Sequence, residues 1–341
     1  MGGWAIFCAL CGGPFSSQVD MDCEGTDERA YRFDILEDCN LDWLDELQAL
    51  GMNPNATGSD KSFVTGVGRY WDCGGIEVIA GNHINSPCPK DEVVPMVAYH
   101  DFSEIGLPHV FPFHPVCYEA LRRCISLGQP GGEIRGDTLY RVFEETNGGR
   151  YVRLQLDYGD PDPPAEQVWE IFRGQEILVV NPVDIPELQS EIRDIKSLLG
   201  TKVDRPGDGE TKWHARGDIF GHLPIELRHE IFEYLRPESI LALKAASRVM
   251  HTTSCPESLW AGKLVDTYPW LWEMHELDLF QSQDLEEKAS QLLRTCRDNG
   301  AFSSKGHSYV LGLANRRRIW GVCEQVRSQY AEKLAVVTRQ V

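Results

Sequence analysis

A strongly polar stretch, residues 200–217 (GTKVDRPGDGETKWHARG), divides the chain into two parts of different charge. Residues 1–100 hold 16 acidic and 5 basic side chains, residues 101–200 hold 17 and 9, and residues 201–341 hold 19 of each. The stretch has almost no apolar residue and contains several turn formers, which is typical of a linker. We therefore expect an acidic first part and an electrically balanced second part.

The acidity of the first part excludes some classes of partner. An acidic surface repels phosphate groups, so we expect neither nucleic acid nor a membrane surface as a partner. No run of 18 apolar residues and no secretory signal is present, which favours the cytoplasm, the nucleus or both. In such a reducing, intracellular compartment the 11 cysteines would be free thiols or metal ligands.

The residues before the linker show both strand and helix patterns. Glycine turns between β-branched and aromatic residues at 63–81 predict short strands. Residues 115–125 predict a helix that opens with proline, and 139–146 predict another. Three leucines in one stripe predict a helix at 40–50 (NLDWLDELQAL), and alternation predicts a strand at 151–158. The fold class expected for the whole chain is α+β.

Two short pairs of metal-ligand residues stand about a hundred positions apart. Cys8 and Cys11 form a Cys-x2-Cys pair directly before Gly12, which is typical of the start of a zinc knuckle. His114 and Cys117 lie at the start of a predicted helix, whose dipole favours a thiolate. Together they predict a closed Cys3His structural zinc site. The alternative is three buried thiols and a hydrogen-bonded core histidine. Other cysteines could substitute as ligands, although none has a close partner: Cys23, Cys39, Cys73 and Cys88.

The segment 219–262 predicts a compact helical hairpin followed by a third helix. Proline opens a helix at 224–235 and again before the helix at 238–250. One apolar residue in every fourth position lines the first helix: Leu223, Leu227, Ile231 and Leu235. Ile225, Phe232 and Tyr234 lie off that stripe. So short a segment cannot bury apolar residues on several faces by itself, which indicates a partner surface or packing on the rest of the chain.

The residues of this segment resemble an F-box in their order. The matching elements are Leu223-Pro224, Glu226-Leu227, Ile231, Leu235, Ile240, Leu243, Ala246-Ser247-Arg248 and Leu259-Trp260. Val249-Met250 stands where the family often has a tryptophan. The resemblance implies docking onto a Skp-type adaptor, which bridges to a cullin. The residues that it implies for adaptor binding are Leu223, Pro224, Ile225, Leu227, Ile231, Leu235, Ile240, Leu243 and Trp260. The alternative is an ordinary helical hairpin of a larger α domain.

Further segments resemble F-box proteins of filamentous fungi. Residues 312–320 (GLANRRRIW) are similar to a helix that closes many of them, and here a stripe is formed by Ile319, Cys323, Val326 and Tyr330. The N-terminal region shares a Cys-x2-Cys-Gly-Gly start, a Trp-Leu helix and a His-Pro-x-Cys-Tyr element; here these are Cys8 to Gly13, Trp43-Leu44 and His114 to Tyr118. The three consecutive arginines are interpreted as a solvated helix face, with a nuclear signal as the alternative.

The expected organisation has five parts. An acidic α+β region at 1–135 carries the zinc site, and 136–199 connects it through a helix at 186–199 to the linker at 200–217. The F-box at 218–262 precedes a C-terminal helical region at 263–341, with helices at 257–267, 284–297 and 311–333.

The expected function is a non-catalytic, substrate-recruiting F-box subunit of an SCF-type cullin–RING ubiquitin ligase, whose protein target is unknown. No hydrolase elbow, Walker A motif or His-Glu-x-x-His motif is present, and a catalytic RING domain needs eight spaced ligands. The alternatives are a zinc-stabilised protein-interaction module without a ligase role and, third, a metalloenzyme.

Overall fold

The computed structural model describes residues 5–58, 60–72, 75–79, 85, 92–99, 109–128, 134–148, 152–164, 168–199, 218–255, 259, 262–263, 266–273, 300 and 310–339. The chain forms two compact units, Met1–Ile185 with Phe302–Val341, and Pro186–Ala301. This division differs from the five expected parts, because the end of the chain joins the first unit rather than a region that begins at residue 263. The predicted linker at 200–217 lies outside the described residues. No helix in the described ranges is both long and apolar enough to cross a membrane.

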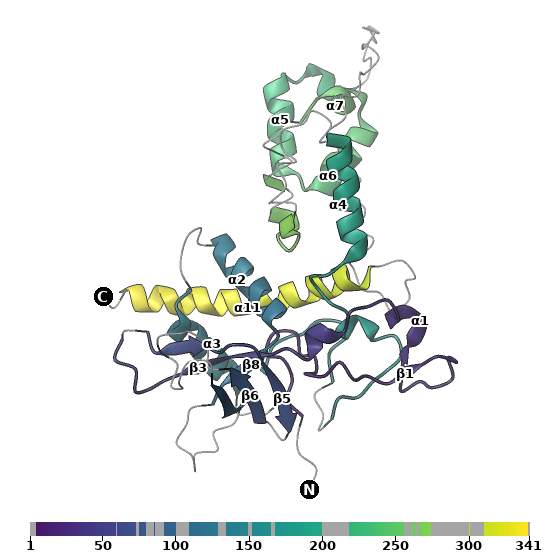
Figure 1. Cartoon of the computed structure of the whole chain (residues 1–341). Coiled ribbons are helices and arrows are strands. Elements are labelled where there is room, and N and C mark those ends of the chain that lie inside the picture. The colour runs from purple at the N-terminus through teal and green to yellow at the C-terminus, as the bar shows by residue number, and fades with distance from the viewer. Residues whose placement is uncertain are drawn as a thin grey trace. The chain divides into compact units, whose positions relative to one another are not determined.

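The first unit contains two antiparallel sheets of three strands each (Figure 1). One sheet has the order β4-β3-β8, with β3 at Gln48–Met52, β4 at Ser62–Val64 and β8 at Phe111–Phe113. In its register Leu50 faces Val64 on one side and Phe111 on the other. Phe111 and Leu50 are both buried, so the middle of this sheet belongs to the core.

The second sheet has the order β5-β6-β7, with β5 at Gly68–Asp72, β6 at Gly75–Ile79 and β7 at Val93–Val97. Along β6 the side chains of Ile76 and Val78 are buried, as alternation predicts for a strand with one covered face. The predicted strands within 63–81 are therefore confirmed. Single bridges join the two sheets, from Leu47 to Gly68 and from Ala98 to Val110.

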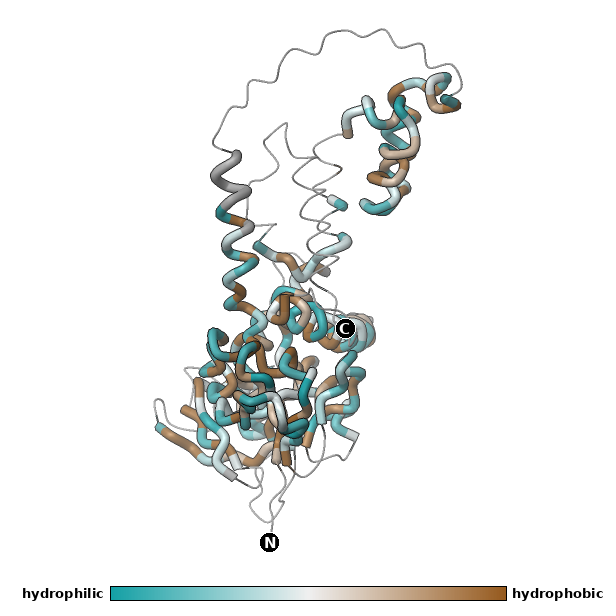
Figure 2. The backbone as a smooth tube through the Cα atoms, turned by 90° about the vertical axis from the view of Figure 1, so that its right-hand side faces the viewer, coloured by the Kyte–Doolittle hydropathy of each residue, from teal (hydrophilic) through white to brown (hydrophobic). Residues whose placement is uncertain are grey.

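The remaining short elements of this unit are a parallel strand pair, β1 at Met21–Asp22 and β2 at Tyr31–Arg32, and the turns α1 at Phe33–Leu36, η1 at Asp42–Leu44 and η2 at Glu176–Leu178. Their apolar side chains add to the core; Tyr31, Leu36, Leu44 and Ile177 are all buried. Figure 2 shows hydrophobic segments distributed through the body of this unit.

Three helices complete the first unit: α2 at Pro115–Gly128, α3 at Gly136–Asn147 and α11 at Leu311–Arg339. The two helices predicted at 115–125 and 139–146 are thus confirmed. Helix α11 contacts α2, α3 and η2, and Figure 1 shows it running past α2. The predicted stripe is buried along the whole contact: Ile319, Cys323, Val326 and Tyr330.

The arginines of α11 differ from their sequence-based interpretation. Arg317 is exposed, but Arg316 and Arg318 are buried, so a solvated face and an accessible nuclear signal are both wrong for these two side chains. The guanidinium Nε of Arg316 donates to the carbonyl oxygen of Pro182 at 2.6 Å. Next to it, Asn315 donates to Val180 O at 2.7 Å. Asn315 and Arg316 therefore tie α11 to residues 180–183.

Two predicted elements are wrong. The chain forms only η1 in place of a helix at 40–50, because the following residues extend into β3 and pair with β8. Tertiary pairing here outweighs local helix propensity. The predicted strand at 151–158 is not a strand within its described part, 152–158. Its backbone groups bond to separate elements, for example Gln155 N to Thr146 O at 2.8 Å and Phe7 N to Val152 O at 2.9 Å.

The second unit is helical where it is described. Its elements are α4 at Pro186–Leu199, η3 at Ile219–His222, α5 at Ile225–Tyr234, α6 at Pro237–Ala246 and α7 at Arg248–Thr252. The helix predicted at 238–250 is split at Ser247, whose hydroxyl accepts a hydrogen bond from Met250 N at 3.1 Å and so caps α7. The region predicted as helix 284–297 lies outside the described residues, and 257–267 is described only in part.

A small core holds the second unit together. Its buried apolar side chains are Phe232, Ile240, Met250, Leu259, Tyr268, Trp270, Leu271 and Trp272. Asp218 joins two of the helical turns, because its carboxylate accepts from Phe220 N at 3.0 Å, Ser247 Oγ at 2.8 Å and Val249 N at 3.1 Å.

Candidate functional site

The two predicted ligand pairs meet in the core of the first unit. The sulfur atoms of Cys8, Cys11 and Cys117 and a ring nitrogen of His114 all lie within 4.8 Å of one another. All four residues are fully buried. Three thiols and one imidazole at such distances form a group that could hold a metal ion, as the Cys-x2-Cys and His-x2-Cys spacing predicts.

The first pair lies on a tight turn closed by backbone hydrogen bonds. Cys8 N donates to Gly13 O at 2.9 Å and Gly12 N donates to Cys8 O at 2.9 Å. Gly12 has φ +70°, and a Cβ there would lie 2.8 Å from Pro163 Cγ, so only glycine fits without strain. The turn points amide groups at sulfur: Cys11 N donates to Cys8 Sγ at 3.4 Å and Gly13 N donates to Cys11 Sγ at 3.3 Å. Such donors stabilise thiolates.

The second pair lies where β8 runs into α2. His114 immediately precedes the helix, and its carbonyl oxygen accepts from Cys117 N at 3.0 Å. Cys117 therefore occupies the first turn of α2, where the helix dipole favours a thiolate. His114 N donates to Cys8 Sγ at 3.4 Å, which links the two pairs directly.

The imidazole of His114 is oriented for ligation. Its Nε2 lies 3.1 Å from Pro14 O, and a carbonyl oxygen can only accept, so Nε2 carries the proton. Nδ1 lies 3.4 Å from Cys11 Sγ and faces the centre of the cluster, where it could bind a metal ion once it is deprotonated. A second hydrogen bond of this kind is the usual way in which proteins fix a ligand histidine. The rings of Phe15 and Trp43 cover it, with centroids 4.7 and 4.6 Å away.

The pKa values of Cys8, His114 and Cys117 differ from their ordinary values. Burial alone would raise the pKa of Cys8, but hydrogen bonds from Cys11 and Cys117 and the charge of His114 hold it well below its usual value. Burial would lower the pKa of His114, but the negative charge of Cys11 and Cys8 raises it to about 10. Burial raises the pKa of Cys117 well above its usual range. A metal ion would have to displace the protons of His114 and Cys117.

Arg318 contributes a buried positive charge to the same region. Its Nη1 donates to the carbonyl oxygens of Cys11 at 2.9 Å and Tyr158 at 3.1 Å, and its Nη2 and Nε donate to Asn315 Oδ1. These acceptors are neutral, and no carboxylate pairs with Arg318 within the described ranges. No sequence pattern marks this role, because only the packing of α11 shows which arginine turns inward.

Other parts of the chain support the turn that carries Cys8 and Cys11. Ala9 N donates to Pro112 O at 2.8 Å, Tyr158 Oη donates to Ala9 O at 3.0 Å, and Tyr99 Oη donates to Phe7 O at 2.6 Å. Trp43, from the Trp-Leu element singled out in the sequence, also donates through Nε1 to Val179 O at 3.0 Å. The three N-terminal motifs therefore converge on one site.

The other cysteines proposed as substitute ligands do not join the cluster where they are described. Cys23 is exposed, and Cys39 lies three residues after α1, where its thiol donates a hydrogen bond to Ile35 O at 3.4 Å. Cys73 and Cys88 lie outside the described residues.

The predicted adaptor-binding residues of the second unit differ in exposure. Pro224, Ile225 and Leu227 are exposed, whereas Leu223, Ile231, Leu235 and Leu243 are half-buried. Ile240 is fully buried and belongs to the unit's core, so it cannot contribute to a surface in this structure. Trp260 lies outside the described residues. Tyr234, not among the predicted residues, is 88% exposed.

Helix α5 therefore buries an unexpected face. Among its residues only Phe232 is buried, and the ammonium group of Lys244 lies over the Phe232 ring, 5.4 Å from its centroid. Lys244 is held there by donating to Thr253 O at 2.7 Å. The regular stripe at Leu223, Leu227, Ile231 and Leu235 remains outside the core. Comparisons with known proteins leave the F-box likeness a prediction, since no family model, no curated protein and no solved structure matches this chain.

Proposed function

We propose that the chain is a substrate-recruiting F-box subunit of an SCF-type cullin–RING ubiquitin ligase, with the helical second unit binding the Skp-type adaptor. The observation that carries this proposal is the incompletely buried apolar stripe, exposed at Leu227 and half-buried at its other three positions, on a unit that has a core of its own. Leu227 is 46% exposed and Ile225 is 49% exposed, and Ile219 just before them is 73% exposed. Exposed apolar side chains that follow one another closely along a short segment are typical of a partner surface.

The order of residues in this segment favours a Skp-type adaptor over another helical partner. The Leu-Pro start at Leu223-Pro224 and the stripe that follows resemble F-box elements, and the unit's own core leaves these residues half-buried or exposed. Each apolar side chain that becomes buried in a complex contributes about 1.5–3 kcal/mol. The two central stripe residues, Leu227 and Ile231, would then account for about a hundredfold or more in affinity.

The test measures binding of the full chain to a purified Skp-type adaptor by calorimetry. Leu227→Glu combined with Ile231→Ser should weaken binding by at least about a hundredfold. Val336→Glu is the matched control, because Val336 is an exposed apolar residue of α11 in the first unit. Wild-type affinity in the double variant, or no binding by the wild-type chain, would refute the proposal.

The metal centre has a structural role in this proposal. Three thiolates and one histidine are the donor set of structural zinc, and four protein ligands fill a tetrahedral site. Their complete burial leaves no open position for a substrate, which favours a non-catalytic chain over a metalloenzyme. Zinc would stabilise the first unit, which would present the target. Elemental analysis should find about one zinc per chain, and none in a Cys11→Ser, Cys117→Ser variant.

A second candidate function rests on the cluster alone. The chain would be a zinc-stabilised protein-interaction module that binds no adaptor. The two candidates share the metal and differ in the second unit, so a zinc-loaded chain that ignores the adaptor would select the second one.

A further inference from the structure

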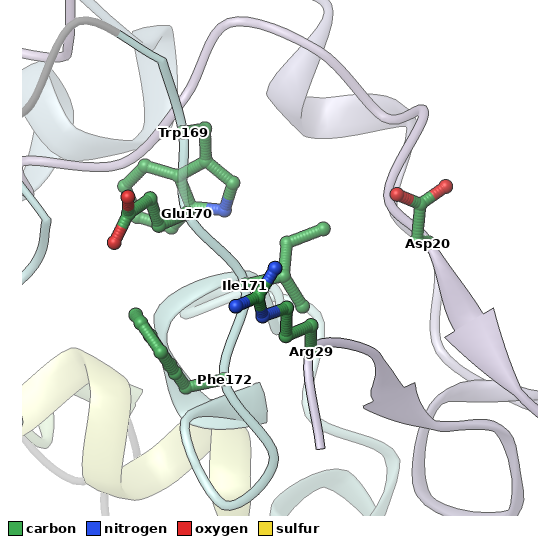
Figure 3. A pocket seen from close by; sticks show the side chains of 6 residues that line it. All are labelled: Asp20, Arg29, Trp169, Glu170, Ile171 and Phe172. Atoms are coloured by element: carbon green, nitrogen blue, oxygen red, sulfur yellow. The ribbon is translucent and has the colours of Figure 1, made fainter. Parts of the chain in front are cut away.

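The first unit carries a hollow that the proposed function does not use. It has a volume of about 310 Å³ and is lined by Asp20, Arg29, Trp169, Glu170, Ile171 and Phe172 (Figure 3). That volume lies at the lower end of the range for ligand pockets, which suits one or two side chains better than a large cofactor. Four consecutive residues of one extended segment form one wall, and Asp20 and Arg29 belong to the strand-and-loop region around β1.

The apolar wall is exposed although the unit has a well-filled core. Phe172 is 43% exposed and Val168, beside the hollow on the same segment, is 59% exposed. Trp169 is half-buried, and two contacts on its buried side hold its ring in place. Its Nε1 donates a hydrogen bond to Tyr31 Oη at 3.3 Å, and the centroid of its ring lies 5.6 Å from that of Phe7. A firmly seated aromatic residue with apolar neighbours at the surface is typical of a binding hot spot.

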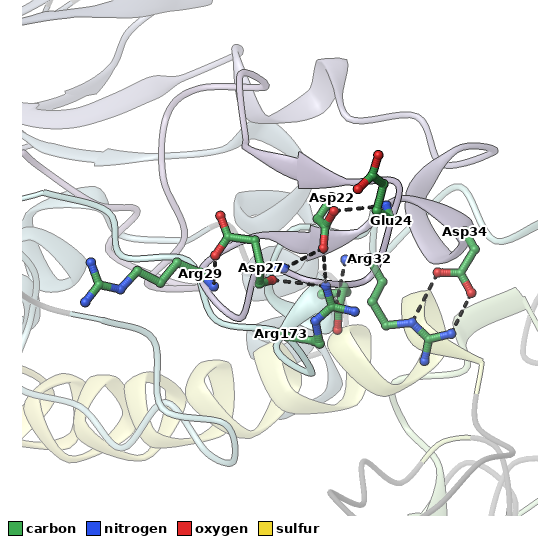
Figure 4. A network of polar contacts seen from close by, with 8 residues as sticks. Asp22, Glu24, Asp27, Arg29, Arg32, Asp34 and Arg173 are labelled. Carbon is green, nitrogen blue, oxygen red and sulfur yellow. Dashed lines mark hydrogen bonds and ion pairs between the residues drawn. The ribbon is translucent and has the colours of Figure 1, made fainter.

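The loop that supplies two lining residues, Asp20 and Arg29, is held in place by its own polar contacts before any ligand arrives. The Asp22 carboxylate accepts from Glu24 N at 3.0 Å and Asp27 N at 2.7 Å, and it pairs with Arg173 at 2.7 Å (Figure 4). Arg173 follows the apolar wall directly, and it also donates to Asp27 O at 3.0 Å. The Asp22 and Arg173 side chains are only 11% and 27% exposed, so this link is largely shielded from water. A preformed loop lowers the entropy cost of binding.

The negative charge around the hollow indicates which kind of ligand would bind there. Residues 20–28 hold five carboxylates and no basic side chain, and the carboxylate of Asp22 is paired with Arg173 (Figure 4). At the hollow itself Asp20 and Glu170 stand against one guanidinium, that of Arg29. A surface of this sign attracts cationic groups and repels phosphate or acidic peptides.

We propose that this hollow is a docking site for a short extended segment of a target protein, in which a large apolar side chain is flanked by lysine or arginine. The apolar side chain contacts Trp169, Ile171 and Phe172, and the flanking cations face Asp20 and Glu170. The inference rests on the proposed recruiting function, since it names the class of target that the first unit would present.

The test uses three fluorescein-labelled peptides and the full chain, followed by anisotropy. The first peptide is Ser-Gly-Arg-Leu-Phe-Arg-Gly-Ser, the second has glutamate in place of both arginines, and the third has glycine in place of leucine and phenylalanine. We expect the first to bind at least about tenfold more tightly than either of the others. Phe172→Ser should remove that preference, and Glu170→Lys should shift it toward the acidic peptide.

Trp71→Ser is the matched control, because Trp71 is a 72% exposed aromatic residue of β5 away from the hollow. The docking proposal is overturned if the three peptides bind alike, if the acidic one binds best, or if Phe172→Ser binds as the wild type does. Adaptor affinity is measured on the same variants and should not change. A chain that binds the basic peptide but no adaptor would remove the ligase role alone; a chain that binds the adaptor and none of the peptides would remove this docking site alone.

Discussion

Replacement of Arg318 by methionine tests how the buried cluster and α11 depend on each other. A site with one Zn²⁺ and three thiolates carries a net charge of about −1, which is costly in the core unless a positive charge lies near it. Arg318 is the buried cation that donates to the Cys11 carbonyl, on the backbone of a ligand residue. Methionine keeps much of the side-chain volume and removes both the charge and the donors.

The expected loss of stability follows from the backbone groups that lose their hydrogen-bond donor. Two backbone carbonyl oxygens, those of Cys11 and Tyr158, lose a charged donor in the core. Each unsatisfied buried acceptor costs about 1–3 kcal/mol, so we expect about 4 kcal/mol of lost stability. For a unit of this size that lowers the melting temperature by about 8–16 °C. The loss of a group that supports a metal ligand should also weaken zinc binding by about 10–100-fold.

The assay combines thermal unfolding by near-ultraviolet circular dichroism with zinc affinity from chelator competition. Arg317→Met is the matched control, since the same change is made one residue away at an exposed position. Arg318→Lys keeps the charge and loses the planar fork, so it should recover zinc affinity more than melting temperature. Cobalt substitution should give the same thiolate absorption bands in all variants. The reasoning is refuted if Arg318→Met and Arg317→Met melt together and bind zinc equally.

Two further predictions concern pH. Because protons compete with the metal for His114 and the cysteines, zinc retention should fall as the pH is lowered and proton release should accompany zinc uptake; pH-dependent calorimetry in two buffers measures both. Hydrogen bonds from Val249 N and Ser247 hold the pKa of Asp218 below its ordinary value of 3.8, so its contribution to the second unit is present above that value and is lost as the pH falls through the lowered pKa. Asp218→Asn should therefore flatten the acid limb of a helicity titration; an unchanged limb would show that Asp218 does not matter.

The Cys3His cluster could be predicted from the sequence because the spacing that defines it is local. Cys8 and Cys11 lie on one tight turn, and His114 and Cys117 lie on one turn at a helix start, so spacing alone defines each pair. The supporting residues could not be predicted, because Arg318 and Trp43 reach the site only through packing across the unit. Packing across the unit also explains why the predicted helix at 40–50 is wrong. The leucines of that segment lie in and around η1 and in β3, which pairs with β8.

The helical stripe of the second unit shows what a sequence pattern does not predict, namely which face of a helix the chain itself buries. Periodicity at Leu223, Leu227, Ile231 and Leu235 predicts an amphipathic helix, and α5 confirms that helix. Periodicity does not say which face is covered by the chain itself, and here the core takes Phe232. A pattern that usually marks core residues thus marks residues that the core leaves half-buried or exposed, and only the structure separates the two cases.

The insertion of the second unit into the first leads to a last prediction. The first unit is interrupted after Ile185 and resumes at Phe302, and a Cβ at Gly312 would lie 2.9 Å from Ile185 Cγ1. The two ends are also joined by hydrogen bonds from Asn315 and Arg316 to residues 180–183. Units inserted between adjacent points can be removed without breaking the host core.

Deletion of residues 186–309, with Ile185 joined to Val310 by about six glycine and serine residues, should therefore leave a folded first unit. Such a chain keeps both ligand pairs and Arg318, so it should bind about one zinc and unfold cooperatively. It should also bind the basic apolar peptide while losing the adaptor. A second, shorter chain, which lacks α11 as well, serves for comparison. Helix α11 supplies Arg318 and packs on α2 and α3, so the shorter chain should fail to hold zinc. A deletion chain that aggregates with its zinc lost, or a chain without α11 that holds zinc as firmly as the wild type, would contradict a first unit built from both ends of the sequence around one metal centre.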